Sequence, residues 1–254
     1  MKDLLIMKDT MNRILRRFNC EVHGLGYLAK LAKGEFKKDG YQQQKELFTG
    51  KPVRVIFDVG ANWGGISRQY RSLFPEAKIL SFEPLPDIYK VLVETSISDS
   101  NIIPYNTAIS NKTGHETLYV NRNVDSSSLL ASKLTGTGTD KQTATVREIT
   151  VATITIDEIC KKQGITAIDI LKLDIQGGEL KALAGASKLL AEKKIALIYT
   201  EVSFFSAYKN SPLFHDIAQY LYSFGYQLGD LYDPFYTSRY LVQADALFLS
   251  SQFM

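Results

Sequence analysis

The chain has 254 residues, of which 45% are hydrophobic and 22% are charged, values typical of a globular protein with an ordinary core. A net charge of +3 without a concentrated arginine stripe gives no basis for nucleic-acid binding. No apolar run approaches the length of a membrane span, and the N-terminus lacks a secretory cleavage site. We therefore expect a cytoplasmic protein without stable membrane insertion, and free thiols at Cys20 and Cys160.

Residues 1–50 are predicted to form a basic helical cap. Met7, Met11, Ile14 and Phe18 recur at helical spacing, with lysine and arginine on the other faces. The alternatives are a lid over the substrate, a homodimer contact, or a surface for anionic membrane.

From residue 51 onward the sequence alternates between short apolar strands and amphipathic helices. Alternation of this kind predicts an α/β domain with a mostly parallel, Rossmann-like sheet. We expect Asp87 to cap one helix, and Ser211 with Pro212 to begin the last. The expected strands are 53–58, 78–83, 101–105, 168–173 and 195–201, and the expected helices lie near 64–74, 87–97, 176–190 and 212–223.

Two segments depart from this alternation. Residues at about 107–152 are predicted to form an antiparallel insertion, with strands at 115–121 and 145–152 around a Ser/Thr/Gly-rich loop. Near the C-terminus, 226–231 and 244–249 are two strands with no helix between them, which predicts a terminal antiparallel hairpin. Parallel strands closed by such a hairpin are typical of class I methyltransferases more than of dehydrogenases.

A glycine turn follows the first strand, at Asp58-Val-Gly60-Ala61-Asn62. A strand, a glycine turn and a helix N-terminus together form a seat for a nucleotide-bearing cofactor. Asn62 stands where the dinucleotide fingerprint has its second glycine, so its side chain would obstruct a pyrophosphate. Asp58 is poorly placed for a phosphate and well placed for an ammonium. Both features favour S-adenosylmethionine, which carries a ribose and an amino acid but no phosphate.

A second apolar strand ends about twenty residues later at Glu83-Pro84. A carboxylate at this position and spacing accepts hydrogen bonds from ribose hydroxyls. NAD would use the same carboxylate, so Glu83 predicts a nucleoside without identifying it.

Two further strands end in the carboxylates Asp174 and Glu201. Ligands of open α/β sheets bind beyond the carboxyl ends of the strands, so Asp58, Glu83, Asp174 and Glu201 are expected to converge on one edge. After Asp174 the chain turns through Gly177-Gly178 into a helix.

The ordered set of these motifs resembles the FkbM family of S-adenosylmethionine-dependent methyltransferases over about residues 53–249. The resemblance implies methylation of a hydroxyl, often of a sugar or polyketide, and places Ala61, Pro84, Ala108 and Ser127 in cofactor-binding motifs. The matching segments are Phe57–Asn62, Ser81–Pro84, Asn106–Gly114, Ser126–Leu129, Leu171–Glu179 and Asp245–Phe248. The sequence departs from the family at Gln176, where Glu is common, and at Trp63, where a small or aliphatic residue is usual.

Methyl transfer to an alcohol needs alignment of the reacting atoms and a general base. We expect Asp174 or Glu201 to be that base, with Asp174 equally suited to hold the ammonium of the cofactor's methionine part. His215 is a weaker candidate. No metal-ligand spacing is visible, although two nearby carboxylates could hold a divalent cation. The aromatic residues of 231–240 suggest a surface that packs against the methyl acceptor, which we call the acceptor wall.

The sequence therefore predicts an O-methyltransferase acting on a sugar, a glycan or a small hydroxylated metabolite. Two alternatives remain open. One is an NAD(P)-dependent oxidoreductase or epimerase, and the other is a non-catalytic binding module on the same scaffold.

Overall fold

The computed structural model describes residues 39–133, 144–205 and 208–253. The chain divides into two compact units, Met1–Asp39 and Gly40–Met254. The predicted helical cap at 1–50 therefore lies largely outside the described residues, as does Cys20. Its last part does not, because helix α3 (Gly40–Leu47) belongs to the second unit.

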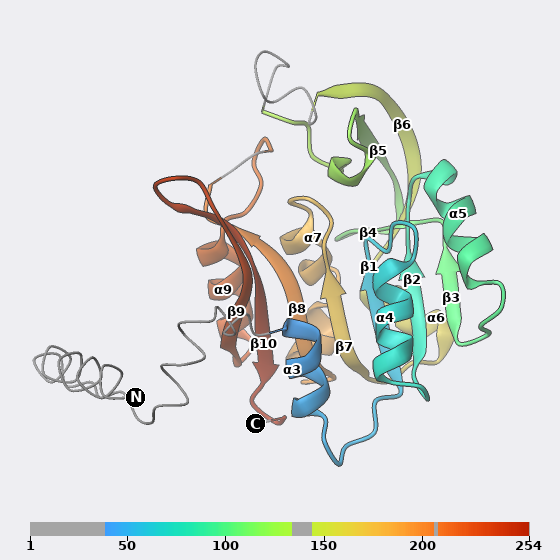
Figure 1. Ribbon diagram of the computed structural model, residues 1–254, viewed down its shortest axis with the longest axis vertical. Helices are drawn as coiled ribbons and strands as arrows, with labels where there is room; N and C mark the ends of the chain where they lie inside the picture. The colour runs from blue at the N-terminus through green and yellow to red at the C-terminus, as the bar shows by residue number, and fades with distance from the viewer. Residues whose placement is uncertain (1–38, 134–143, 206–207, 254) are drawn as a thin grey trace, which may run out of the picture. The chain divides into compact units, whose positions relative to one another are not determined.

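The second unit is built on a seven-stranded sheet in the order β3-β2-β1-β7-β8-β10-β9 (Figure 1). Five neighbouring strands are parallel, and β10 runs antiparallel between β8 and β9. The strands are β1 (Val55–Val59), β2 (Lys78–Phe82), β3 (Ile102–Tyr105), β7 (Ile168–Leu173), β8 (Ile195–Ser203), β9 (Tyr226–Tyr236) and β10 (Leu241–Ser250). This order confirms the predicted class I methyltransferase fold with its terminal antiparallel hairpin.

Helices cover both faces of this sheet (Figure 1). On one face, α3 and α4 (Gly65–Leu73) pack on a cluster that includes Ile56, Ile79 and Leu197. On the other face, the core around Phe57, Leu171 and Ile198 is closed by four further helices. These are α6 (Ile156–Gln163), α7 (Glu179–Ala184), α8 (Ser187–Ala191) and α9 (Phe214–Ser223), while α5 (Pro86–Ser96) contacts the edge strand β3.

A second, three-stranded sheet occupies the region predicted as an insertion. Its order is β4-β6-β5, with β5 antiparallel to β6 and β4 parallel to it. The strands are β4 (Ala108–Ile109), β5 (Gly114–Asn121) and β6 (Thr145–Ile154). The short 3-10 helix η2 (Val124–Ser126) follows β5. A small apolar cluster containing Leu85, Leu118 and Val151 packs this sheet against the segment after β2. Figure 1 shows the three-stranded sheet beyond the carboxyl ends of β1 and β2.

Three predicted helix boundaries are wrong. Residue Leu85, and not Asp87, is the N-cap of α5, and Asp87 forms an exposed ion pair with Arg147. Helix α9 begins after Leu213, whose backbone N–H donates to the Asp216 carboxylate. It therefore starts later than Ser211 and Pro212 suggested.

The third error is the helix predicted near 176–190, which is two short helices separated at Gly185. A side chain at Gly185 would overlap the backbone carbonyl oxygen of Ser110. The carboxylate of Asp157 then accepts from the backbone N–H groups of Lys188 and Leu189 and so begins α8.

Candidate functional site

A cavity of about 420 Å³ opens at the carboxyl ends of β1, β2 and β7. Its volume is in the range of small-molecule sites. Eight of the nine residues predicted to bind a cofactor line it, and Asp58 is the exception. The eight are Gly60, Ala61, Asn62, Glu83, Pro84, Ala108, Ser127 and Asp174.

The glycine turn forms one wall of the cavity and is tied to the strands on both sides. The backbone N–H groups of Gly60 and Ala61 donate to the Phe82 carbonyl oxygen at 3.1 and 3.0 Å. Gly60 has φ of 77°, and a side chain there would overlap the backbone carbonyl oxygen of Asp174. Only glycine therefore permits the turns after β1 and β7 to approach this closely.

Asn62 lines the cavity, and one of its side-chain atoms has no hydrogen-bond partner among the described residues. Its φ of 49° is left-handed, a conformation that asparagine tolerates better than most residues. The Nδ2 group donates to Oδ1 of Asp125 at 2.8 Å, whereas Oδ1 of Asn62 is buried without a hydrogen-bond partner among the described residues. A buried unpaired carbonyl oxygen is costly unless a ligand donates to it. The side chain is thus suited to receive an N–H or O–H group of a bound molecule.

Glu83 lies at the end of β2 with its carboxylate held by the backbone. Oε2 accepts from the Asn62 N–H at 3.1 Å and Oε1 from the Leu85 N–H at 2.8 Å. Burial raises the pKa of Glu83 to about 7 against these two hydrogen bonds. A carboxylate can accept about four hydrogen bonds, so places remain for two hydroxyl donors. Such donors would favour the ionised form.

Asp58 is fully buried and does not line the cavity. One carboxylate oxygen accepts from the Ser67 hydroxyl at 2.6 Å, and the other lies 3.2 Å from Nζ of Lys172. The expected direct contact between Asp58 and the cofactor is therefore replaced by a different role, that of counter-ion to a buried lysine.

Lys172 is the site residue that the sequence interpretation missed. It is 3% exposed, lines the cavity floor, and lies 3.7 Å from Oδ2 of Asp174 as well as 3.2 Å from Asp58. Burial alone would lower its pKa, but the two carboxylates outweigh burial and raise the pKa above its usual range. The available signal was a lysine between Leu171 and Leu173, near the end of the predicted strand 168–173.

Gln176 connects the two carboxylates that were candidates for the general base. Its Nε2 lies 3.1 Å from Oδ1 of Asp174 and 3.1 Å from Oε2 of Glu201, and its Oε1 lies 3.0 Å from the Tyr208 hydroxyl. The residue has φ of 57°. Because an amide donates to both carboxylates, Gln176 allows them to lie close together, where a third carboxylate would repel both.

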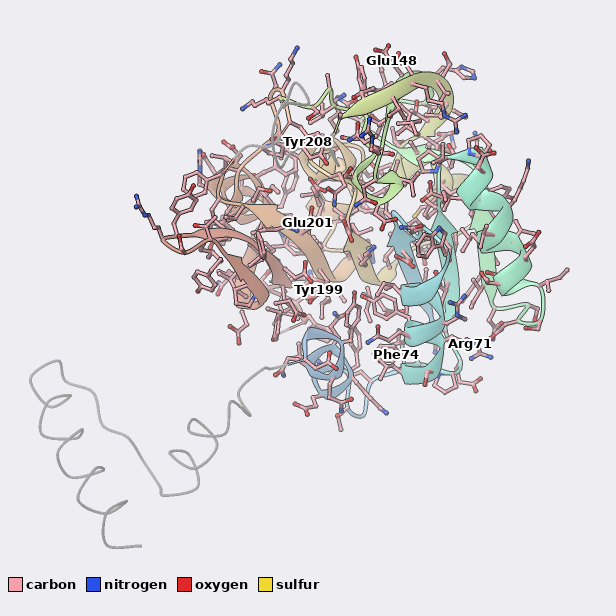
Figure 2. All side chains as sticks on the ribbon, turned by 45° about the horizontal axis from the view of Figure 1, so that its top comes forward. Arg71, Phe74, Glu148, Tyr199, Glu201 and Tyr208 are labelled. Atoms are coloured by element: carbon pink, nitrogen blue, oxygen red, sulfur yellow. The ribbon has the colours of Figure 1, made fainter. Side chains whose placement is uncertain are left out.

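Glu201 is half-buried and lines neither of the two main cavities of the described residues. The side-chain amides of Gln176 and Gln243 both donate to its carboxylate. Burial, followed by the charges of Asp174 and Glu179, raises its pKa well above the ordinary value. Figure 2 labels Tyr199, Glu201 and Tyr208, which follow one another in that view from α3 toward the small sheet.

The aromatic residues near Glu201 fall into two groups. Tyr208 and Tyr232 are buried and belong to the packing. At the hairpin end, Phe235 and Tyr236 are 61% and 60% exposed, and the ring of Tyr240 lies 4.4 Å from that of Phe205. Of the aromatic residues at 231–240 that were hypothesised to contact the acceptor, only the exposed ones, Phe235, Tyr236 and Tyr240, remain candidates for this role.

Other candidates have less support. His215 is exposed on α9, pairs with the adjacent Asp216 and does not line the cavity. Within the described ranges no group of three or more His, Cys, Asp and Glu side chains is arranged to hold a metal ion. In those same ranges, no helix has the length and apolar character needed to cross a membrane.

Comparison with known proteins places the chain among methyltransferases. Residues 58–228 match the model of the Methyltransferase FkbM domain. The chain is 28% identical over 159 residues to the 2-O-methyltransferase NoeI of Sinorhizobium fredii, covering 60% of this chain and 65% of that protein. It is 30% identical over 175 residues to the methyltransferase sdnD of Sordaria araneosa, covering 57% and 68%.

A third relative is the hexuronic acid methyltransferase AglP of Haloferax volcanii, 26% identical over 145 residues, covering 57% of this chain and 54% of that protein. Among solved structures, precorrin-6y C5,15-methyltransferase from Geobacter metallireducens aligns with a TM-score of 0.47 and 10% identity, covering 83% of this chain and 87% of that one. Magnesium protoporphyrin IX methyltransferase from Synechocystis aligns with a TM-score of 0.45 and 13% identity, covering 99% and 98%.

Proposed function

Because the chain belongs to the FkbM methyltransferase family, we propose that it transfers a methyl group from S-adenosylmethionine to a hydroxyl of a sugar, a glycan or a small hydroxylated metabolite. The observation that carries this proposal is the cavity at the strand ends, lined by Glu83 near the glycine turn and by Asp174 after β7. Three carboxylates line it in all, the third being Asp125. Arg68 and Lys172 also line it, so the charged side chains leave one net negative charge, which suits a cationic sulfonium ligand better than a pyrophosphate.

The residues of the cavity fit this cofactor. Glu83 has room for the two ribose hydroxyls, and the unpaired Oδ1 of Asn62 can accept from a polar group of the ligand. The half-exposed carboxylate of Asp174 suits the ammonium of the methionine part. When bound, the cofactor supplies a methyl group activated on a sulfonium sulfur.

The two candidate bases have different surroundings. Asp174 lines the cavity, is 44% exposed and lies 3.7 Å from the Lys172 ammonium, a position that suits a ligand of the cofactor. Glu201 has a raised pKa, which brings its basicity toward the range in which general bases operate at neutral pH. We therefore assign Glu201 as the general base that accepts the proton of the acceptor hydroxyl, and Asp174 as the cofactor ligand.

The acceptor assignment is supported by the relatives. NoeI is named as a 2-O-methyltransferase and AglP as a hexuronic acid methyltransferase. Around Glu201 the chain offers amide groups at Gln176 and Gln243 and exposed aromatic rings at the hairpin end. Amides and aromatic faces together suit a ring that carries hydroxyl groups.

Calorimetric titration of the purified protein with S-adenosylhomocysteine and with NAD tests the cofactor. We expect binding of S-adenosylhomocysteine only, and selective binding of NAD would instead support the oxidoreductase alternative. Transfer of a labelled methyl group to a panel of monosaccharides, uronic acids and hydroxylated aglycones tests the acceptor. Cofactor binding without transfer to any hydroxyl would overturn the O-methyltransferase assignment.

A further inference from the structure

The ammonium of Lys172 lies where the turns after β1 and β7 meet. It donates to the Gly60 carbonyl oxygen at 3.1 Å and lies 3.5 Å from that of Val59. On its other sides are Asp58 at 3.2 Å and Asp174 at 3.7 Å. An ammonium has three donors, and these four oxygen acceptors come from the end of β1, the glycine turn and the segment after β7.

The same two turns are also joined by the backbone. The Asp174 N–H donates to the Val59 carbonyl oxygen at 3.1 Å, and Gly60 approaches Asp174 too closely for any side chain. Asp174 itself is 44% exposed and lines the cavity, as Gly60 does. Gln176 donates to the other oxygen of the Asp174 carboxylate, and Lys172 is the side chain that connects this carboxylate to the glycine turn.

We propose that Lys172 is a positioning residue which fixes the Asp174 carboxylate against the glycine turn, so that together they receive the amino-acid end of the cofactor. This inference rests on the proposed function. Lys172 lines the cavity and is assigned no contact with the acceptor. Its charge is balanced by Asp58, so the cluster of Asp58, Lys172 and Asp174 keeps one net negative charge for a cationic ligand.

The charge balance decides which effect a substitution would have. In a Lys172→Met variant the buried Asp58 loses its counter-ion, and an unpaired buried carboxylate is costly. Asp58 does not line the cavity, and the Asp174 carboxylate that does line it is not itself changed by the substitution. The substitution removes the contact that fixes the position of Asp174. Binding of the amino-acid end of the ligand should therefore weaken, because this is the part that contacts Asp174.

The test compares two ligands that differ in that end. S-adenosylhomocysteine carries the amino acid, whereas 5′-methylthioadenosine lacks it. For Lys172→Met we expect the Kd of S-adenosylhomocysteine to rise about tenfold, which corresponds to the loss of one hydrogen bond between Asp174 and the ligand. The Kd of methylthioadenosine should change less than about twofold. Lys172→Arg should recover part of the affinity. Lys162→Met, which removes an exposed lysine 3.7 Å from Glu158, is the matched control and should bind both ligands normally.

A double variant keeps the experiment decisive if the single variant does not fold. Asp58→Asn with Lys172→Met removes both charges of the buried pair and should show the same selective loss. Equal weakening of both ligands, or normal binding of both, would overturn the role of Lys172 while leaving the cofactor assignment intact. If the unmodified protein fails to bind S-adenosylhomocysteine, the proposed function is overturned and this inference with it.

Discussion

The two faces of the large sheet are built from different kinds of residue. The face covered by α6, α7, α8 and α9 is apolar, with Phe57, Leu171 and Ile198 fully buried. The face toward α3 and α4 carries a polar row at one register level, Ser81, Asp58, Lys172 and Tyr199 on four adjacent strands. Parallel strands need no polar residue for their packing. The row therefore distinguishes this face from the apolar one, and its Lys172 lines the cavity.

This comparison separates stability from activity. Substitutions on the apolar face should lower the free energy of unfolding without changing the chemistry of the folded protein. Substitutions at the end of the polar face should change binding or turnover. Each of the following experiments tests whether stability and activity depend on different residues in this way.

The largest effect is expected for Glu201→Gln. Removal of a general base lowers kcat by about 10² to 10⁴, with S-adenosylhomocysteine affinity retained. Because burial raises the pKa of Glu201, the rate of the unmodified enzyme should increase with pH through that raised pKa, and the variant should lose this limb. Steady-state kinetics across pH measure both, with the exposed Glu192→Gln as control. Turnover at the normal rate would remove Glu201 from the mechanism.

Ile198→Ala tests the apolar face. Ile198 is fully buried among apolar residues, and truncation of such a side chain costs about 2–5 kcal/mol in the free energy of unfolding. Urea denaturation measures this loss, and kcat per folded molecule should be unchanged. A fall in kcat of the folded fraction would show that the two faces are not functionally separate.

Glu179→Gln tests a buried carboxylate outside the reacting groups. Burial raises the pKa of Glu179 to about 7, although its Oε1 accepts from the Ile175 and Gly177 N–H groups. A carboxyl whose pKa is raised by folding stabilises the protein while it is protonated. That contribution is complete below the unfolded pKa and is lost as the pH rises through the folded pKa.

We therefore expect Glu179→Gln to match the unmodified protein near pH 4.5 and to exceed it above pH 7 by up to about 3 kcal/mol, the equivalent of the shift. The amide oxygen can keep both backbone hydrogen bonds. Urea titrations of the two proteins at several pH values give the difference. A difference independent of pH would show that Glu179 does not titrate in this range.

The smallest effect is expected for Glu83→Gln. The two N–H groups of Asn62 and Leu85 donate to different oxygens of Glu83, and an amide has only one oxygen, so it can accept from only one of them. It also loses the charge that strengthens hydrogen bonds from ribose hydroxyls. We expect the Kd of S-adenosylhomocysteine to rise about tenfold. Calorimetry with the exposed Glu76→Gln as control measures it. Unchanged affinity would remove Glu83 from the ribose site.

The positions of two candidate site residues, Glu83 and Asp174, were predicted correctly from the strand pattern, whereas their roles stay predictions. Glu83 and Asp174 end strands that the apolar runs located correctly, and the carboxyl ends of parallel strands meet at one edge whatever the details of packing. The prediction failed at Asp58. That residue is one position from the strand end, and only its partners in space show that it faces Lys172 rather than the cavity.

Helix boundaries were predicted less well because they depend on contacts between distant segments. The break at Gly185 follows from its approach to Ser110, which lies 75 residues earlier in the sequence. The bridge from Gln176 to Asp174 and Glu201 likewise joins two strands of the sheet. No local pattern carries information about such distances.

The sequence by itself determined the α/β class, the glycine turn and the carboxylates at the strand ends, because strand periodicity and turn chemistry are local properties. The tertiary structure alone decided which carboxylates are paired with Lys172, which are bridged by Gln176, and which line the cavity. These differences set charge and basicity. They arise from distances of a few ångströms between residues that lie far apart along the chain.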